Sequence, residues 1–576
     1  MDYTIRIGGE AGQGLQTVGA ALAKVLSRQG YHVFTHQDYM SRVRGGHNFY
    51  QVRVSEKPLC ASKDRINILV ALDRDTITIH QDALAEHGIV LYDPAGAGEE
   101  FSGDRFMATP FDRLAEESGG SKIMANSVAI GAVLGLFGLA PEIMQEVLAE
   151  FLSKKNEEIV QENMRAVKAG HDHVRRNCKS LQHFTVCPSS GQRLMLINGI
   201  QAVAAGAVMS GCKFYAAYPM TPSTGVMVYL AGKAAEFNII VEQAEDEISA
   251  INMALGASYA GVRAMTGTSG GGFALMTEGL SLAGMTETPL VIMEGQRPGP
   301  ATGLPTRTEQ GDLSFVIHGG HGEFPRVVLA PGSPEQAFFA ANKAFDLAEK
   351  YQIPVFILTD QYLADTEWTS PGFDPEKLVY EDYRLRRAAL QRITEYKRYA
   401  CTDSGISPLA VPGDSTHLVV VDSDEHDEEG HIIEDAATRV NMMHKRLFAK
   451  RDRLQAEIAM PVLYGDPRPR IVLLGFGSTL GVMKEVVDEL ASVCPIAMLH
   501  FSEVYPFPAL EEHHLLETLQ AAELTICIEN NATGQFQRLL RAETGFLCSG
   551  RINRYDGRPF TLESLLGQVR EQMAKM

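Results

Sequence analysis

One stretch of the sequence places a carboxylate in a setting suited to acid–base chemistry. In EQAEDEISAINMALGASYAG, residues 242–261, Glu247 precedes Gly256 by nine residues and is followed by several small side chains. A carboxyl group at the end of a strand, beside such a tightly packing helix, would be desolvated, and desolvation raises its pKa. The group could then share a proton with the ring nitrogen of a heterocycle. A helix-capping role for the same acid remains open, because acids favour helix N-termini.

A proline-rich loop could present hydroxyl groups to a ligand. In FYAAYPMTPSTG, residues 214–225, Pro219 and Pro222 exclude a regular helix or a central strand. We therefore expect an apolar strand to end at Tyr218 and a stiff loop to follow, with Thr221 among its exposed hydroxyl groups.

Two further loops suggest close contact with a ligand. EGQRPGPATGLPTRTEQGDL, residues 294–313, places Arg297 before prolines and glycines, where its guanidinium could bind a carboxylate or phosphate through two donors. A salt bridge to a neighbouring acid is the alternative. In TGTSGGGFALM, residues 266–276, three consecutive glycines indicate close approach of the backbone to a flat ligand or to another subunit.

The N-terminal region contains a glycine turn and a basic loop. GGEAGQG, residues 8–14, has the order G-x-x-G-x-G rather than the G-x-G-x-x-G of dinucleotide-binding proteins, which disfavours NAD. Another phosphate-bearing ligand and a plain tight turn both remain open. YMSRVRGGHN, residues 39–48, adds Arg42, Arg44 and His47, which could face phosphate, a protein partner or solvent.

Composition excludes several classes of protein. The chain has 576 residues and a net charge of −19, which argues against a nucleic-acid-binding surface. We find no signal segment and no apolar run long enough to cross a bilayer, so we expect a cytoplasmic protein without a membrane segment. None of the eight cysteines forms C-x-x-C, which disfavours a zinc site or an iron–sulfur cluster held by this chain alone. The acidic run DSDEHDEEGHIIED does not fit a calcium loop, and we predict no metal site.

The order of expected strands and helices predicts an α/β fold. YTIRIG (3–8) and YHVFTHQ (31–37) are expected strands joined by a glycine turn and a helix, as in a βαβ unit. Similar alternation returns in two later segments. The predicted organisation is an α/β domain over 1–180, a second over 190–370, an irregular connecting region over 371–465 and a C-terminal α/β domain over 466–576.

Together the motifs resemble one enzyme family. YPMTPST, EDEISAINMALG, TSGGGF, QRPGPATGLPT and LTDQYLAD are similar to the alpha subunit of the 2-oxoacid:ferredoxin oxidoreductases, and GGEAGQG with SRVRGGH resembles the family's gamma domain, fused at the N-terminal end. The resemblance implies that the three α/β domains are a gamma domain, a thiamine-diphosphate pyrimidine-binding domain and a domain like the C-terminal domain of transketolase.

The resemblance also implies roles for individual residues. Glu247 matches the catalytic glutamate that protonates the pyrimidine ring nitrogen of thiamine diphosphate. The implied substrate-binding residues are Thr221, Arg297, Tyr218 and Thr224. The implied cofactor-binding residues are Pro219, Thr268 and Gly271. The implied coenzyme A-binding residues are Gly12, Gly14, Arg42 and Arg44.

The family resemblance further implies a partner. The G-D-G segment with which thiamine-diphosphate enzymes bind Mg²⁺ and the diphosphate is absent from the sequence. A beta subunit is therefore expected to supply that half of the site and a [4Fe-4S] cluster, in an (alpha-beta)2 assembly that reduces ferredoxin. We favour 2-oxoglutarate as substrate, with Arg307, His318 and His321 as candidates for its distal carboxylate. Pyruvate, branched-chain 2-oxoacids and a non-catalytic assembly role remain open.

Overall fold

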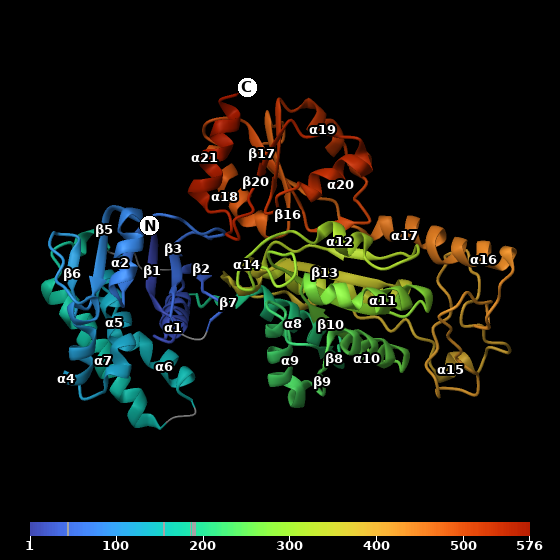
Figure 1. The fold of residues 1–576 in the computed structure, drawn as a ribbon, viewed down its shortest axis with the longest axis horizontal. Coiled ribbons are helices and arrows are strands. Elements are labelled where there is room, and N and C mark those ends of the chain that lie inside the picture. The colour runs from blue at the N-terminus through green and yellow to red at the C-terminus, as the bar shows by residue number, and fades with distance from the viewer. Residues whose placement is uncertain (43–44, 154–155, 185, 187–191, 576) are drawn as a thin grey trace. The chain divides into compact units, whose positions relative to one another are not determined.

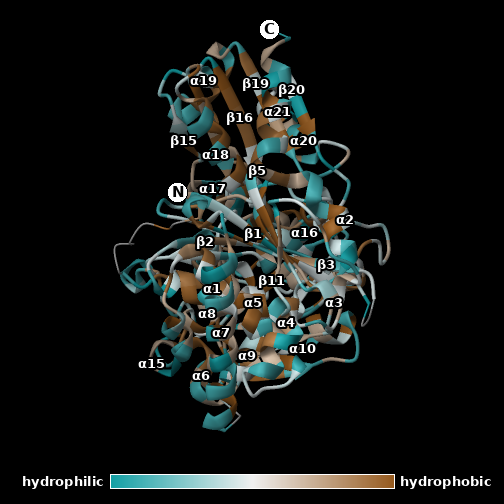
Figure 2. Cartoon of the chain, turned by 90° about the vertical axis from the view of Figure 1, so that its left-hand side faces the viewer, coloured by the Kyte–Doolittle hydropathy of each residue, from teal (hydrophilic) through white to brown (hydrophobic). Residues whose placement is uncertain are grey.

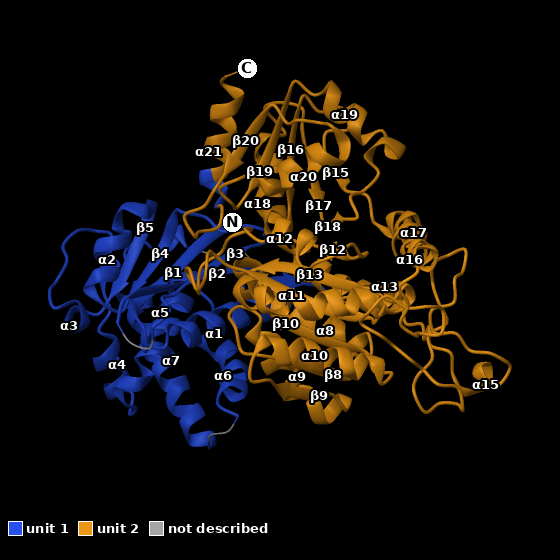
Figure 3. Ribbon diagram, turned by 45° about the vertical axis from the view of Figure 1, so that its right-hand side comes forward, with its two compact units in different colours: residues 1–197, 366–372, 561–564 blue, residues 198–365, 373–560, 565–576 orange. Residues whose placement is uncertain are grey.

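The computed structural model describes residues 1–575 apart from 43–44, 154–155, 185 and 187–191. The chain divides into two compact units, which Figure 3 colours separately. Unit 1 comprises Met1–Ile197, Thr366–Gly372 and Thr561–Ser564. Unit 2 comprises Asn198–Asp365, Phe373–Phe560 and Leu565–Met576.

Unit 1 contains an eight-stranded sheet with the order β6-β5-β4-β1-β3-β2-β14-β7 (Figure 1). The strands expected at 3–8 and 31–37 are present as β1 (Asp2–Glu10) and β2 (His32–Asp38), joined through helix α1 (Leu15–Arg28). Strand β3 (His47–Ser55), which the sequence analysis did not predict, lies between them and runs antiparallel to both. The two strands of the βαβ unit are therefore parallel but not adjacent.

The helices of unit 1 pack closely where glycine replaces larger side chains. A Cβ added to Gly131 of α5 (Ala125–Phe137) would lie 1.9 Å from the backbone oxygen of Val167 in α7 (Glu157–Asn177). The crossing of these helices therefore requires a residue without a side chain. The other elements of this unit are β4 (Ile66–Ala71), α2 (Arg74–His80), β5 (Leu84–Tyr92), α3 (Pro94–Ala97), β6 (Phe106–Ala108), α4 (Phe111–Glu117), α6 (Gln145–Phe151), β7 (Met195–Asn198) and β14 (Glu367–Ser370).

Unit 2 contains a seven-stranded sheet with the order β18-β12-β13-β11-β10-β8-β9. Its strands are β8 (Phe214–Ala217), β9 (Ile240–Gln243), β10 (Ala264–Thr268), β11 (Leu290–Gln296), β12 (Val327–Leu329), β13 (Pro354–Asp360) and β18 (Glu503–Tyr505). Neighbours from β12 to β9 are parallel, and β18 is antiparallel to β12. Every residue of β10, β11 and β13 is buried, as expected for central strands covered on both faces.

Helices precede, connect or follow the strands of this sheet. They are α8 (Gly199–Met209), α9 (Thr224–Phe237), α10 (Glu247–Tyr259), α11 (Gly270–Met285), α12 (Leu313–His318), α13 (Pro334–Tyr351) and α14 (Gln361–Asp365). Helix α8 packs against α13, and α10 packs against α11. Because the strands are parallel, their carboxyl ends and the loops that follow lie at one edge of the sheet.

The connecting region, 371–465, has little regular structure in its first half. It contains α15 (Arg387–Leu390), α16 (Ala436–Met443), a π-helical turn (His444–Phe448), α17 (Ala449–Glu457) and β15 (Val462–Gly465). Its cations Lys445 and Lys450 pair with Glu287, which follows α11, and all three side chains are buried. This ion cluster attaches the region to the seven-stranded sheet's helices.

The third sheet combines β15 of the connecting region with strands of the C-terminal segment, in the order β15-β17-β16-β19-β20. Figure 2 shows its central strands β16 (Ile471–Phe476) and β19 (Leu524–Glu529) as hydrophobic, in agreement with their complete burial. The remaining elements are β17 (Ile496–Phe501), β20 (Gly550–Asn553), α18 (Leu480–Leu490), α19 (Leu515–Ala521), α20 (Gln535–Thr544) and α21 (Leu562–Met573).

The expected α/β fold with three sheet-containing segments is confirmed, whereas the residue boundaries of the domains stay predictions. No single helix among the described residues has the length and apolar character needed to span a membrane, although one bent pair, Phe111–Glu117 with Lys122–Phe137, passes that test together. The described residues also contain no group of three or more His, Cys, Asp or Glu side chains placed to hold a metal ion.

Candidate functional site

Four consecutive strand ends of the seven-stranded sheet bring most of the predicted site residues to one edge. Strands β9, β8, β10 and β11 are parallel neighbours in that order. The loop 218–223 follows β8, Glu247 follows β9, Thr268 ends β10 and Arg297 follows β11. The topology thus brings to one edge residues that lie up to 79 positions apart in the sequence, from 218 to 297.

Glu247 is the first residue of α10, but it does not cap that helix. The cap is Asp246, whose side chain accepts a hydrogen bond from the Ser249 backbone N–H at 2.7 Å. Glu247 itself is only 3% exposed, and its Oε1 has no hydrogen-bond partner in the described part of the chain. Burial raises the pKa of Glu247 above its ordinary value. A buried, unpaired carboxyl oxygen is suited to a ligand that brings its own donor.

The three glycines that begin α11 make room for this carboxyl group. A Cβ added to Gly272 would lie 2.1 Å from Thr268 Oγ1 and 2.4 Å from Glu247 Oε1. Gly271, the glycine singled out in the sequence, has more space, since its Cβ would meet only the Ala301 backbone oxygen, at 3.7 Å. The sequence analysis therefore missed Gly272, which a run of three glycines does not distinguish from its neighbours.

The loop 218–223 is attached to Arg297. Arg297 donates a hydrogen bond from Nη1 to the backbone oxygen of Thr221 at 2.8 Å. Pro222 packs on β11, because a Cβ on Gly295 would lie 2.6 Å from Pro222 Cγ. The Nε atom of Arg297 is buried without a partner among the described residues, and burial lowers the pKa of this guanidinium. Part of its hydrogen-bonding capacity is thus left for a ligand.

The other predicted substrate- and cofactor-binding residues differ in their exposure and hydrogen bonds. Tyr218 is exposed, and Pro219 is half-buried. Thr224 begins α9 and donates its backbone N–H to the Met220 oxygen at 3.1 Å. Thr268 is fully buried, and its hydroxyl donates to the Ser269 backbone oxygen at 3.3 Å.

The three candidates for a distal carboxylate lie before, at the end of and after helix α12. Arg307 lies on the loop that connects Arg297 with α12 and packs against Gly557. His318 ends α12 and His321 follows it, and both side chains are exposed.

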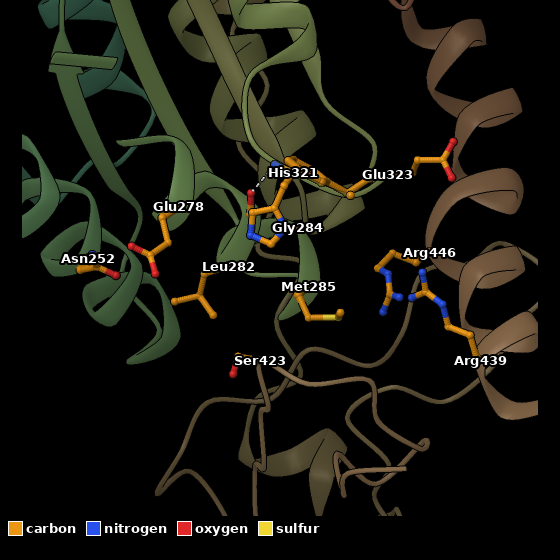
Figure 4. A pocket seen from close by; sticks show the side chains of 14 residues that line it. Asn252, Glu278, Leu282, Gly284, Met285, His321, Glu323, Ser423, Arg439 and Arg446 are labelled. Atoms are coloured by element: carbon orange, nitrogen blue, oxygen red, sulfur yellow. Dashed lines mark hydrogen bonds between the residues drawn. The ribbon is translucent and has the colours of Figure 1, made fainter. Parts of the chain in front are cut away.

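His321 borders a separate open cavity of about 620 Å³ on unit 2 (Figure 4). Its backbone N–H donates to Ser281 Oγ at 2.9 Å, the dashed line in the figure. Glu278 lies on one side of this cavity and the guanidinium groups of Arg439 and Arg446 lie on the other. Both arginines form ion pairs with Glu425, which offsets part of their positive charge. The arginines therefore do not make this cavity a simple anion-binding site.

The predicted coenzyme A residues belong to unit 1. Gly12 and Gly14 have φ values of 98° and 80°, which favour glycine, and Gly14 directly precedes α1. Arg42 is exposed. Arg44 lies outside the described residues.

The sequence analysis missed two acids near the site, the fully buried Glu294 and the partly buried Asp312. Glu294 is in β11, beside Thr268 of β10, and Asp312 directly precedes α12. An acid inside the apolar run PLVIMEG was the signal that could have revealed Glu294.

Comparison with known proteins agrees with this arrangement. Residues 205–445 match the family described as pyruvate flavodoxin/ferredoxin oxidoreductase, thiamine diphosphate-binding, and residues 4–173 match that described as pyruvate ferredoxin/flavodoxin oxidoreductase. A 2-oxoacid:ferredoxin oxidoreductase subunit alpha from a Sulfolobus species is 32% identical, over 97% of this chain and 95% of its own. The 2-oxoglutarate oxidoreductase subunit KorA of Mycobacterium tuberculosis is 27% identical, over 94% and 87%.

A solved structure is similar over the full length. It is the 2-oxoglutarate:ferredoxin oxidoreductase from Magnetococcus marinus with 2-oxoglutarate, coenzyme A and succinyl-CoA bound, at 32% identity and a TM-score of 0.91 over 99% of both chains. With these matches, the chain belongs to the 2-oxoacid:ferredoxin oxidoreductases, as an alpha subunit with the gamma domain at its N-terminal end.

Proposed function

We propose that this chain, together with a beta subunit, catalyses the reversible conversion of 2-oxoglutarate, coenzyme A and two oxidised ferredoxins into succinyl-CoA, carbon dioxide, a proton and two reduced ferredoxins. The C1–C2 bond of the 2-oxoacid breaks, a thioester bond forms at C2, and the two electrons released pass singly to ferredoxin. The family name supports the reaction class, and the bound molecules of the Magnetococcus marinus structure support the choice of substrate. Several relatives are named only as 2-oxoacid enzymes, so pyruvate and branched-chain 2-oxoacids are the competing substrates.

The observation that carries the proposal is the burial of the Glu247 carboxyl group without a hydrogen-bond partner for its Oε1 among the described residues. Gly272 leaves the space in front of this carboxyl group free of a side chain. These features fit a donor or acceptor nitrogen of an aminopyrimidine. Thiamine diphosphate, when bound, supplies a thiazolium that accepts the electron pair of the breaking C1–C2 bond. Glu247 holds a proton at the pyrimidine ring nitrogen, and its raised pKa favours that shared proton.

Arg297 and Thr221 are proposed to bind the substrate. The guanidinium of Arg297 is oriented by its bond to the Thr221 backbone and has donors left for the 1-carboxylate. The Thr221 hydroxyl lies on the same loop and is proposed to bind the 2-oxo group, with Tyr218 and Thr224 beside it. Pro219, Thr268 and Gly271 are proposed to border the cofactor.

A beta subunit is proposed to supply the Mg²⁺ and diphosphate half of the site and the [4Fe-4S] cluster. Support comes from exposed apolar side chains on the helices next to Glu247, among them Ile248 and Met253 on α10 and Leu275 on α11. Exposed apolar side chains are typical of a surface that another subunit covers. In the gamma domain, Gly12, Gly14, Arg42 and Arg44 are proposed to bind coenzyme A, in an (alpha-beta)2 assembly.

A substrate comparison tests the proposal. The co-expressed complex is assayed for reduction of a viologen dye with coenzyme A and either 2-oxoglutarate, pyruvate or 2-oxoisovalerate. We expect the highest kcat/KM with 2-oxoglutarate. A higher kcat/KM with pyruvate or 2-oxoisovalerate would identify that acid as the preferred substrate instead. Absence of turnover with all three acids would favour a non-catalytic assembly subunit.

A further inference from the structure

The sheet of the C-terminal segment has a switch point between β16 and β19, where the chain leaves two neighbouring strands in opposite directions. Strands β17, β16, β19 and β20 are parallel neighbours in that order. From β16 the chain continues through α18 to β17 on one side, and from β19 it continues through α20 to β20 on the other. In such sheets the crevice outside the carboxyl ends of these two strands is the usual place for a ligand.

A side chain of the chain itself occupies this crevice. Gln310 is fully buried, and its Nε2 donates to the backbone oxygen of Phe476, the last residue of β16, at 2.8 Å. Its Oε1 accepts from the N–H of Asn530, directly after β19, at 3.0 Å, and its own N–H donates to the Asn530 oxygen at 2.6 Å. Gly477 leaves room for this side chain, since a Cβ there would lie 2.9 Å from Gln310 Nε2. Gln310 therefore joins both sides of the switch point.

Other polar groups of the crevice also have partners within the chain. Glu529 accepts hydrogen bonds from two backbone N–H groups in the first turn of α20, at 2.7 and 3.0 Å. Gln535, the first residue of α20, accepts from the Ser314 N–H at 2.8 Å and donates to the Gly311 backbone oxygen. The crevice thus binds the segment 310–314 where a ligand would otherwise lie.

This segment completes the Arg297 loop, residues 297–312. The loop leaves β11 at Arg297 and returns to the end of that strand, because the Asp312 N–H donates to Gln296 Oε1 at 3.0 Å. Asp312 also packs against the start of α11, since a Cβ added to Gly270 would lie 2.4 Å from Asp312 Oδ2. The part of the loop that is attached to the C-terminal sheet is therefore attached to the strand end of Arg297 as well.

The middle of the Arg297 loop borders the proposed cofactor side of the site. The Ala301 backbone oxygen lies 3.7 Å from a Cβ added to Gly271. We infer that the switch-point crevice of the C-terminal segment holds the Arg297 loop in place of a ligand, and that Gln310 is the positioning residue through which it does so. This inference rests on the proposed roles of Arg297 and Gly271, which the loop connects.

An apolar side chain of similar length tests this role. Gln310→Met fills the crevice but removes the bonds to Phe476 and Asn530. In the co-expressed complex we expect the KM for the 2-oxoacid to rise about three- to tenfold, and the KM for coenzyme A, proposed to bind in unit 1, to change less than about twofold. The matched control is Thr525→Val. Thr525 is buried at the opposite end of β19 and exchanges hydrogen bonds with Ser549, so this variant should lower the apparent Tm without changing either KM.

Hydrogen–deuterium exchange of the whole complex, measured by mass spectrometry, follows the loop without turnover. The N–H groups of Leu304 and Arg307 donate to backbone oxygens within the loop at 3.0 and 3.1 Å. We expect peptides that cover 299–307 to exchange about tenfold faster in Gln310→Met and at the unmodified rate in Thr525→Val. Unchanged exchange in Gln310→Met would overturn the attachment of the loop. Faster exchange with an unchanged 2-oxoacid KM, or equal KM changes in both variants, would overturn the positioning role.

A second variant covers the case in which Gln310→Met does not assemble. Gln535→Met keeps Gln310 and removes only the bonds to Gly311 and Ser314, so exchange and KM should change in the same direction by a smaller factor. No change in either quantity would overturn the inference. Absence of turnover by the unmodified complex with every 2-oxoacid would instead overturn the proposed function, whereas the exchange rates would still test the attachment of the loop.

Discussion

The guanidinium of Arg297 donates a hydrogen bond to the backbone oxygen of Thr221, which joins the loop after β11 to the loop after β8. Arg297 fixes the loop 218–223, and its Nε has no partner among the described residues. In its proposed role it is therefore expected to bind the 1-carboxylate with little reorganisation.

Arg297→Lys should therefore weaken substrate binding. Lysine keeps the charge but not the two parallel donors, and the loss of a charge-assisted hydrogen bond of about 1.5–3 kcal/mol corresponds to a KM increase of about 10- to 150-fold. Steady-state kinetics of the co-expressed complex measure this change. Arg387→Lys is the matched control, since Arg387 is exposed in the connecting region. An equal effect of both substitutions would count against a role in substrate binding.

Gly272→Ala should disturb the cofactor side of the site. Its Cβ would collide with Thr268 and Glu247, and such overpacking costs about 1–3 kcal/mol. We expect weaker binding of thiamine diphosphate and lower turnover, measured by titrating the cofactor-depleted complex. Gly271→Ala has room for its methyl group and should behave almost as the unmodified complex does. Equal tolerance of both changes would mean that Thr268 and Glu247 can move away from the added methyl group, and that their close packing on Gly272 is not needed for cofactor binding.

The sequence alone indicated Glu247 and Arg297 as candidate site residues. It did not decide whether Glu247 caps a helix or whether Arg297 forms a salt bridge, because both answers depend on residues that only the fold brings close. Glu247 and Asp246 are adjacent acids, and only the fold shows that Asp246 caps α10 while Glu247 is buried. Strand β3 was missed because polar residues such as Arg53, paired with Asp2, interrupt its apolar pattern. The alternation of strands and helices in this part of the chain was predicted, since strands buried on both faces, such as β11 and β13, consist mainly of hydrophobic residues.

Glu294→Gln should stabilise the chain in a pH-dependent way. The pKa of folded Glu294 is raised, so between the ordinary value of about 4.3 and the folded value the folded state retains a proton that the unfolded state has released. The stability contribution of Glu294 therefore falls as pH rises through this window. Glutamine does not titrate, so its advantage in apparent Tm should grow from pH 4 to pH 8. A difference that stays constant over this range would contradict a raised pKa.

Glu287→Gln should strongly destabilise the attachment of the connecting region. Glu287 is buried and pairs with Lys445 and Lys450, so its neutralisation leaves two buried cations uncompensated, at a cost of about 3–5 kcal/mol. Thermal unfolding and limited proteolysis measure this effect. Glu523→Gln, which breaks an exposed pair with Arg470, should leave both unchanged. A Glu287→Gln variant as stable as this control would mean that the buried cluster does not hold the region in place.

The most direct measurement is the turnover of Glu247→Gln in the co-expressed complex, assayed with 2-oxoacid, coenzyme A and a viologen dye at saturating thiamine diphosphate. Proton sharing by this carboxyl group predicts a fall in kcat of about 10²- to 10⁴-fold, whereas Glu245→Gln, a neighbouring exposed acid, should retain full activity. A Glu247→Gln complex that binds the cofactor and turns over at the unmodified rate would contradict the account.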